Sequence, residues 1–201
     1  MPGVKQFDRT EVLRKAMEVF WRQGYEATSV QDLLDAMGIG RGSLYSTFGD
    51  KEQLFLTVWE FYTEEIQAEL IECLLNPDPR LAIEEMFAAI VKRMSDPIYP
   101  RGCLHTNTIV ECPGRAKPIE GKIAESLEKM ETGIYQVLLR GQAANLIASG
   151  RDLRALSRFL VAVAQGIAVM NKAYSDPSVI RDVVKVALNN GIWDSQTNPK
   201  T

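Results

Sequence analysis

The stretch Thr28–Lys51, TSVQDLLDAMGIGRGSLYSTFGDK, decides the fold of this 201-residue chain. Ser29 is a favourable helix N-cap, and apolar residues follow it at the spacing of one helix face as far as Met37. Gly38 then stands where a helix ends in a left-handed residue. A second short helix is expected over 42–48. Two short helices around a glycine-containing turn form a helix-turn-helix, a unit that places its second helix in the major groove of DNA.

Helical periodicity continues on both sides of this stretch, and no strand pattern or repeat interrupts it. One helix is expected over 8–23, and a long one from Asp50 to about Leu75. Further helices are expected over 81–95, 103–111, 119–149, 152–174 and 177–190. The sequence therefore predicts an all-α protein of about nine helices. A three-helix helix-turn-helix domain is expected over 1–49 and a larger C-terminal helical domain over 50–201, with helix 50–75 connecting them. Ligand sensing and dimerisation are expected of the larger domain from the family resemblance given below.

The charge balance excludes a broad basic surface. The net charge is −3 and the isoelectric point is near 5.4. Residues 1–51 hold seven Lys and Arg against seven Asp and Glu. Any DNA binding must therefore come from a few placed groups and from dimerisation.

The chain offers little for disulfide or metal chemistry. Its cysteines are Cys73, Cys103 and Cys112, an odd and sparse set that does not form a disulfide framework. His105 is the only histidine, and no zinc-ligand spacing occurs. We expect no metal and no cofactor. With no signal-type segment and no run near the roughly 18 apolar residues of a membrane span, a cytoplasmic protein without membrane contact is expected.

The second helix of the unit carries residue types suited to reading DNA. Arg41 can pair with guanine through two hydrogen bonds, and small Ser and Thr side chains let the backbone approach. Gly42 also permits a close approach to phosphate. Helix N-termini favour anions, so Thr28 and Lys51, near the starts of two helices, suit phosphate contacts.

The run from Phe7 to Val58, which contains GYEATSVQDLLDAMGIGRGSLYSTFGDKEQLF, resembles the DNA-binding domain of the TetR family of transcriptional repressors. It covers about a quarter of the chain. Two positions depart from the family pattern: Thr47, where many members have histidine, and Gly40, where many have a polar residue. The resemblance implies contacts to double-stranded DNA from Thr28, Gln31, Arg41, Gly42, Ser43, Tyr45, Ser46, Thr47 and Lys51.

The last two helices are apolar over much of their surface. The self-complementary surface of a homodimer would explain this, because a body of this size cannot bury both helices fully. Packing inside one chain is the alternative. The resemblance implies a four-helix dimer interface, for which the candidates are Phe159, Val163, Ile167, Met170, Ile180, Val183 and Val184.

The resemblance also implies a pocket for a small-molecule effector in the C-terminal body. Effector binding would shift the fourth helix, so that the two recognition helices no longer match the operator. Each candidate could equally be an ordinary core residue. The candidates for lining this pocket are Phe61, Phe87, Val91, Cys103, Asn107 and Tyr135.

The segment 101–107, RGCLHTN, suggests a different kind of sensor. Its Gly-Cys-Leu start resembles a helix found in one branch of the family. Cys103 would lie near a helix N-terminus, where the helix dipole favours a thiolate. Lys172 could approach it, and Cys112 is a second candidate for redox chemistry. The alternative is that Cys103 is a buried, inert cysteine.

We therefore predict a dimeric repressor that a small-molecule effector releases from a palindromic operator. The first alternative is a repressor switched by oxidation or electrophile modification of Cys103. A helical enzyme is a distant alternative, because no nucleophile–base pair or glycine-rich phosphate loop is present. An adaptor without DNA binding would leave Lys51 and Tyr45 without a role.

Overall fold

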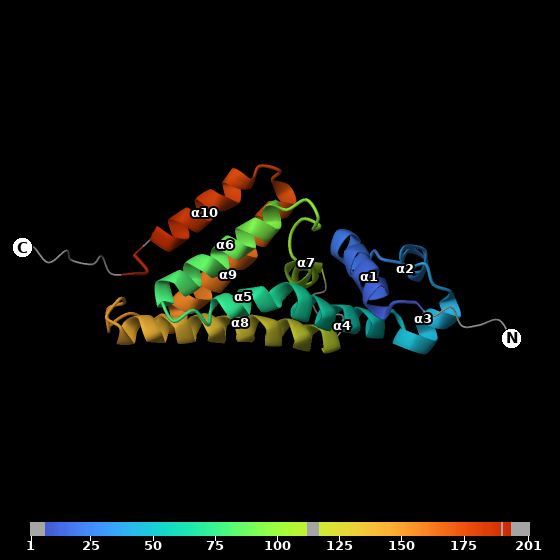
Figure 1. Ribbon diagram of the computed structural model, residues 1–201, viewed down its shortest axis with the longest axis horizontal. Coiled ribbons are helices and arrows are strands. Elements are labelled where there is room, and N and C mark those ends of the chain that lie inside the picture. The colour runs from blue at the N-terminus through green and yellow to red at the C-terminus, as the bar shows by residue number, and fades with distance from the viewer. Residues whose placement is uncertain (1–6, 112–116, 190, 194–201) are drawn as a thin grey trace, which may run out of the picture. The chain divides into compact units, whose positions relative to one another are not determined.

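The computed structural model describes residues 7–111, 117–189 and 191–193. These residues form helices and no strand, which confirms the all-α prediction (Figure 1). With α4, η1 and α5 taken as one helical path, the described residues form nine helical segments, as predicted. The elements are α1 (Arg9–Gln23), α2 (Val30–Met37), α3 (Arg41–Phe48), α4 (Lys51–Tyr62), η1 (Thr63–Gln67), α5 (Ala68–Cys73), α6 (Pro79–Ser95), α7 (Leu104–Glu111), α8 (Lys117–Ala143), α9 (Leu153–Ala173) and α10 (Pro177–Asn189).

The helix predicted over 50–75 is not a single α-helix. A five-residue π-helix, η1, separates α4 from α5. Such wider turns are rare and often occur at functional sites. Apolar periodicity could not reveal this one, because Ile66 within η1 and Leu70 after it are both buried, as they would be in an unbroken amphipathic helix.

The ends of the short N-terminal helices follow local sequence chemistry. The Ser29 hydroxyl accepts a bond from the Asp32 amide at 3.1 Å, and the Asp32 carboxylate accepts one from the Ser29 amide at 2.8 Å. This is the capping box that the sequence indicates. Gly38 ends α2 in the left-handed region, with φ of 68°. Asp50 caps α4 by accepting from the Gln53 amide at 2.9 Å.

Packing divides the chain into two compact units. The first contains residues 1–67 and 103–120, and the second contains 68–102 and 121–201. The expected helix-turn-helix domain, 1–49, lies wholly within the first unit, which also includes α4, η1 and α7. The chain thus returns at α7 to pack with the N-terminal helices. A division of function after residue 49 remains a prediction.

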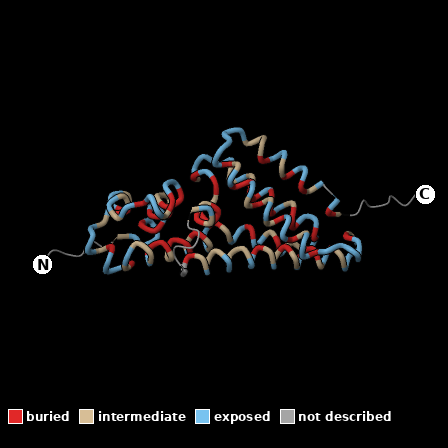
Figure 2. The backbone as a smooth tube through the Cα atoms, turned by 180° about the vertical axis from the view of Figure 1, so that it is seen from behind, coloured by how far each residue is buried: buried red, intermediate tan, exposed pale blue. Residues whose placement is uncertain are grey.

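Aromatic side chains form the centre of the first unit. The Phe20 ring on α1 meets the Phe55 ring on α4 edge to face, with centroids 5.0 Å apart. Trp21 and Tyr62 meet in the same way, also at 5.0 Å. Such pairs add stability beyond the area they bury. Buried positions alternate with mostly exposed ones along α1 and with mostly intermediate ones along α4 (Figure 2), as expected for amphipathic helices.

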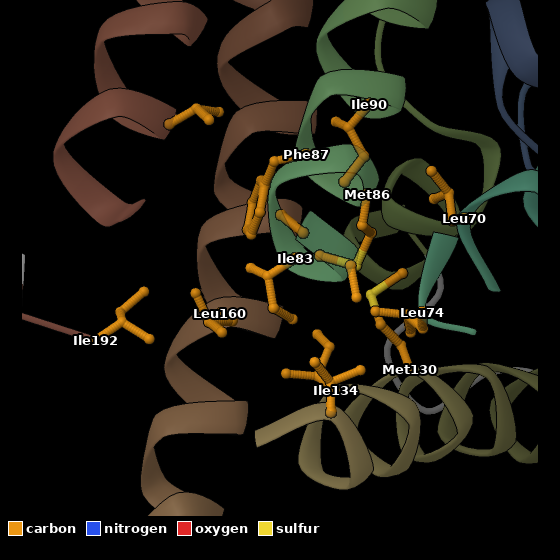
Figure 3. Close-up of a cluster of buried hydrophobic side chains, with 14 of the residues drawn as sticks. Leu70, Leu74, Ile83, Met86, Phe87, Ile90, Met130, Ile134, Leu160 and Ile192 are labelled. Atoms are coloured by element: carbon orange, nitrogen blue, oxygen red, sulfur yellow. The ribbon is translucent and has the colours of Figure 1, made fainter. Parts of the chain in front are cut away.

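The second unit has its own aliphatic core. Ile83, Met86 and Phe87 of α6 are fully buried and lie among side chains of α8 and α9, including Ile134 and Leu160 (Figure 3). Further members come from α5, α10 and the C-terminal Ile192. Deleting such side chains costs about 2–5 kcal/mol each.

Helix α9 is long and apolar enough to cross a membrane by length and composition, with a mean hydropathy of 1.5. The expectation that no run approaches this measure is therefore wrong. The core helix of a globular protein passes the same test. Leu160 and Ile167 have such a role here, because both are completely buried in the second unit. Only 33% of the apolar window is buried, however, and Phe159 and Val169 are 43% and 51% exposed.

Candidate nucleic-acid interface and sensor contacts

Helix α3 presents a polar face to solvent and an apolar face to the core. Leu44 and Phe48, four residues apart, are buried and attach the helix to the first unit. Tyr45 is 46% exposed beside them. Arg41, Gly42, Ser46 and Thr47 are also exposed, and Ser43 is partly buried. Every residue that the sequence assigns to α3 as a DNA contact therefore lies at or near the surface.

The start of α3 is open to close approach. Its N-cap residue, Gly40, has no side chain to cover the amide groups of the first turn. A Cβ atom added to Gly42 would meet nothing within 4 Å. The uncapped N-terminus of a helix favours an anion such as a phosphate.

Two of the predicted contacts lie at the start of α2. Thr28 is only 1% exposed, and its hydroxyl donates to the carbonyl of Gly24 at 2.5 Å. Its side chain therefore orders the turn after α1. Gln31 is exposed, and its amide donates to the Asp35 carboxylate at 2.8 Å.

Lys51 is held against the turn that follows α1. Its ammonium group lies 4.5 Å from the centroid of the Tyr25 ring. It also donates to the carbonyl of Glu26 at 3.5 Å. A cation over an aromatic face is attracted by the ring quadrupole. This places the charge of Lys51 between the turn and the start of α4.

Cys103 lies just before α7, where its carbonyl accepts the first helical bond, from the amide of Asn107 at 2.8 Å. Its sulfur accepts a hydrogen bond from the hydroxyl of Tyr62 at 3.2 Å and a longer one from the amide of Gln67 at 3.8 Å. Tyr62 ends α4, and Gln67 ends η1. The thiol is partly buried rather than enclosed in apolar side chains.

His105 is a buried, neutral side chain. It is 3% exposed, and burial lowers its pKa from 6.5 to about 3. Its ring stacks on Trp59, and its Nε2 lies 3.3 Å from the hydroxyl of Thr63. That hydroxyl donates its proton to the Trp59 carbonyl at 2.8 Å, so Nε2 must carry the hydrogen in this contact.

The remaining pocket candidates divide between the two units. Phe61 is partly buried on α4, and the Asn107 amide donates to the Trp21 carbonyl at 3.3 Å. In the second unit, Phe87 is a fully buried core residue, and Val91 packs against that core. The Cζ atom of the Arg154 guanidinium lies over the Tyr135 ring, 4.1 Å from the ring centroid.

Two candidates for thiol chemistry have no described contact with Cys103. Cys112 lies outside the described residues. Lys172 is exposed on α9, in the second unit. Within the described residues, no group of three His, Cys, Asp or Glu side chains could hold a metal ion.

An open apolar groove runs along α9 and α10. Phe159, Val163 and Val183, all predicted dimer contacts, line it together with Asp182, Val186 and Ala187. Ile167, Ile180 and Val184 instead belong to the core of the single chain, and Met170 packs against that core. Helical periodicity alone could not separate these two faces, because both are apolar.

Several contacting residues were not predicted from the sequence. Trp59 and Tyr62 of α4 and Gln67 of η1 fit the pattern of an ordinary long helix, and nothing in that pattern indicates their contacts with His105 and Cys103. Glu111 was not singled out, although its carboxylate accepts the amide hydrogens of Tyr25 and Glu26. A charged residue ending a short apolar helix was the only signal.

Comparison with known proteins agrees with this geometry. Residues 12–58 match the family described as bacterial regulatory proteins, tetR family. Residues 79–187 match the family described as Tetracyclin repressor-like, C-terminal domain. The uncharacterised HTH-type transcriptional regulator YezE of Bacillus subtilis (strain 168) is 33% identical over 187 residues, covering 92% of this chain and 96% of its own length.

Two further proteins resemble the chain over most of its length. The HTH-type transcriptional repressor ComR of Escherichia coli (strain K12) is 33% identical over 171 residues, covering 82% of this chain and 80% of ComR. A cysteine-substituted variant of the TetR family regulator CifR, solved with 26-base-pair operator DNA, is 27% identical. It matches with a TM-score of 0.87 over 96% of this chain and 100% of its own.

The chain belongs to the TetR family of DNA-binding transcriptional regulators. The family assignment predicted from Phe7–Val58 is therefore confirmed, and so is the prediction that the protein is not an enzyme. Members of the family are soluble regulators.

Proposed function

We propose that the protein is a dimeric repressor that binds a palindromic operator through α3 and is released by a small-molecule effector. The observation that carries this proposal is the two-sided character of α3. Leu44 and Phe48 fix the helix to the core, while Arg41, Tyr45 and Thr47 are exposed. A rigidly mounted helix with a short polar face is suited to entering a major groove.

Recognition in this proposal depends on few charges. Arg41 reads guanine, and Lys51 contacts the phosphate backbone beside the recognition helix. Gly42 lets the first turn of α3 approach a phosphate, and Thr28 orders the turn that leads into α2. Since one helix-turn-helix neutralises few phosphates, a single copy of the chain binds DNA weakly.

A second copy of the chain supplies the missing affinity. The groove along α9 and α10 presents Phe159, Val163 and Val183 as an apolar surface, and the same groove on a partner forms a self-complementary interface. Phe159 is 43% exposed and Val186 66% exposed, which is unfavourable for side chains of this size in water. The helix-turn-helix of each copy then contacts one of the two half-sites of a palindrome.

Release by an effector requires a ligand that favours the conformation unable to bind DNA by roughly 1–3 kcal/mol or more. Phe61, Cys103 and Asn107 in the first unit, and Phe87, Val91 and Tyr135 in the second, remain the proposed pocket residues. Repression is part of this proposal because the relative ComR is a transcriptional repressor. A cytoplasmic location is proposed with it.

The experiment is a selection of operator sequences from a random duplex pool, followed by footprinting on the region upstream of the protein's own gene. We expect the purified protein to enrich a palindrome and to protect it in that region. Enrichment of no palindrome, or equal affinity for all duplexes, would contradict the proposal.

A second candidate is a thiol switch, which the two donors to the Cys103 sulfur favour. The Tyr62 hydroxyl and the Gln67 amide both contact this sulfur, which leaves it within reach of polar groups rather than in an apolar core. With a hydroperoxide, the thiolate attacks the outer oxygen and the O–O bond breaks. Sulfur is oxidised by two electrons to a sulfenic acid, and the peroxide is reduced to water or an alcohol.

The test compares Cys103→Ser with Cys73→Ser under hydrogen peroxide. Burial raises the pKa of the Cys73 thiol, which makes it a poorly reactive control. We expect peroxide to release the operator from the wild type and from Cys73→Ser, but not from Cys103→Ser. An unchanged response in Cys103→Ser would exclude this candidate and leave the reversible effector.

A further inference from the structure

The carboxylate of Glu111 is bound by the turn that follows α1. One of its oxygens accepts the amide hydrogen of Tyr25 at 2.9 Å, and the other accepts that of Glu26 at 2.8 Å. Glu111 is the last residue of α7, more than eighty residues further along the chain. Both oxygens of one anion are therefore satisfied by two consecutive backbone groups, and such charge-assisted bonds are about twice as strong as neutral ones.

Gly24 makes this contact sterically feasible. A Cβ atom at this position would lie 2.4 Å from one Glu111 oxygen and 2.6 Å from the other. Gly24 also has a φ of +87°, which other residues rarely adopt. The glycine thus ends α1 and opens the turn to a carboxylate. A second bond, from the Asn107 amide to the Trp21 carbonyl, joins α7 to the same end of α1.

The same turn contacts two groups at the proposed DNA interface. The Glu26 carbonyl accepts a hydrogen bond from Lys51, whose ammonium also lies over the Tyr25 ring. The Gly24 carbonyl accepts a hydrogen bond from the hydroxyl of Thr28. Glu111 and Lys51 therefore bind the same two residues of the turn, one through amide hydrogens and the other through a carbonyl and an aromatic face.

We propose that Glu111 is a positioning residue for operator binding: it fixes the Gly24–Thr28 turn and thereby places Lys51 on the phosphate backbone. Because Glu111 already orders the turn in the free protein, DNA binding does not bear the entropic cost of ordering it. Glu111 also connects α7, whose first turn follows Cys103, with the DNA interface. This inference rests on the DNA contact proposed for Lys51.

The test is a double-mutant cycle on the full-length protein with the selected operator at fixed salt. Glu111→Gln keeps the shape but replaces one acceptor oxygen with a donor, and we expect it to weaken operator binding about tenfold. Lys51→Ala should weaken binding and reduce the salt dependence by about one phosphate contact. In the Lys51→Ala background, Glu111→Gln should cost less than about threefold, because its route to DNA is already lost.

Two measurements separate positioning from a general loss of structure. Hydrogen exchange should become faster at the Tyr25 and Glu26 amides of Glu111→Gln, while the core amides of Phe20 and Phe55 keep their protection. Gly24→Ala, which displaces the carboxylate, should weaken binding in a way that is not additive with Glu111→Gln. The control is Glu18→Gln on the exposed face of α1, which should change neither binding nor exchange.

The outcomes distinguish the two proposals. If Lys51→Ala leaves the affinity unchanged, the proposed phosphate contact fails, and this inference loses its basis. If Lys51→Ala weakens binding but Glu111→Gln leaves it unchanged or tightens it, only the role of Glu111 is overturned. Equal losses from Glu111→Gln in both backgrounds would also overturn it, because Glu111 would then act by another route than Lys51.

Discussion

The imidazole of His105 lies flat on the indole of Trp59, with ring centroids 3.6 Å apart and ring planes 8° from parallel. This stack joins α7 to α4 within the first unit. The histidine carries no charge there, since burial lowers its pKa to about 3. Burial removes the solvation by water that a protonated ring would need.

The stability of the protein should fall between neutral pH and pH 5 because of His105. Between pH 6.5 and 3 the unfolded chain binds a proton at this residue and the folded chain does not. The free energy of unfolding therefore decreases as the pH falls, by about 2 kcal/mol between pH 7 and 5. Urea unfolding of the wild type and of His105→Gln measures the difference in slope.

The range above pH 5 isolates this effect from the carboxylates. The pKa values of Asp32 and Asp176 are lowered by hydrogen bonds from Ser29 and Ser178. Their stabilising contribution is present above the usual carboxyl pKa and is lost as the pH falls through the lowered values. Equal pH slopes for the wild type and His105→Gln would show that His105 is not held neutral by burial.

Two glycines of the helix-turn-helix should respond oppositely to alanine. Gly38→Ala forces a Cβ into the left-handed conformation and should destabilise the fold by about 1 kcal/mol. Gly42→Ala lies within α3 with open space around it and should stabilise the fold by about 0.5 kcal/mol. Thermal unfolding measures both.

Gly42→Ala also has a functional consequence. Its methyl group would stand between the first turn of α3 and a phosphate, so operator affinity should fall although stability rises. An increase in both would mean that the start of α3 does not approach the backbone.

Disrupting the groove on α9 and α10 should convert the proposed dimer into a monomer. Val183→Asp adds a second carboxylate next to Asp182 in this apolar surface. We expect sedimentation equilibrium to give the monomer mass, and operator affinity to fall by 100-fold or more, on the order of the avidity gained by linking two sites. Ile98→Asp, at a 71% exposed loop position outside the groove, is the control. A dimer that survives Val183→Asp would place the interface elsewhere.

The local chemistry of the helix-turn-helix was predictable from sequence. Ser29, Gly38 and Asp50 act on neighbours within four residues, so their roles as caps follow from spacing alone. The burial of Leu44 and Phe48 follows from the same periodicity.

The contacts of α7 were not predictable, because they join residues far apart in the chain. Nothing in the spacing of Glu111 or Cys103 indicates Tyr25 or Tyr62 as a partner. The π-helix η1 is similarly hidden, since its residues fit an ordinary amphipathic pattern. On α9 and α10, the apolar residues of the core and of the groove differ only in which helix face they occupy.

The role of α3 is tested by Arg41→Ala in a fluorescence anisotropy titration against the selected operator and against variants with each half-site guanine replaced. Arg41 is exposed and carries no described ion pair, so its removal should not affect folding. We expect the loss of about 1–3 kcal/mol of binding free energy on the selected operator and a smaller preference for guanine at one position of each half-site. Unchanged affinity and unchanged base preference at every position would contradict DNA recognition by α3.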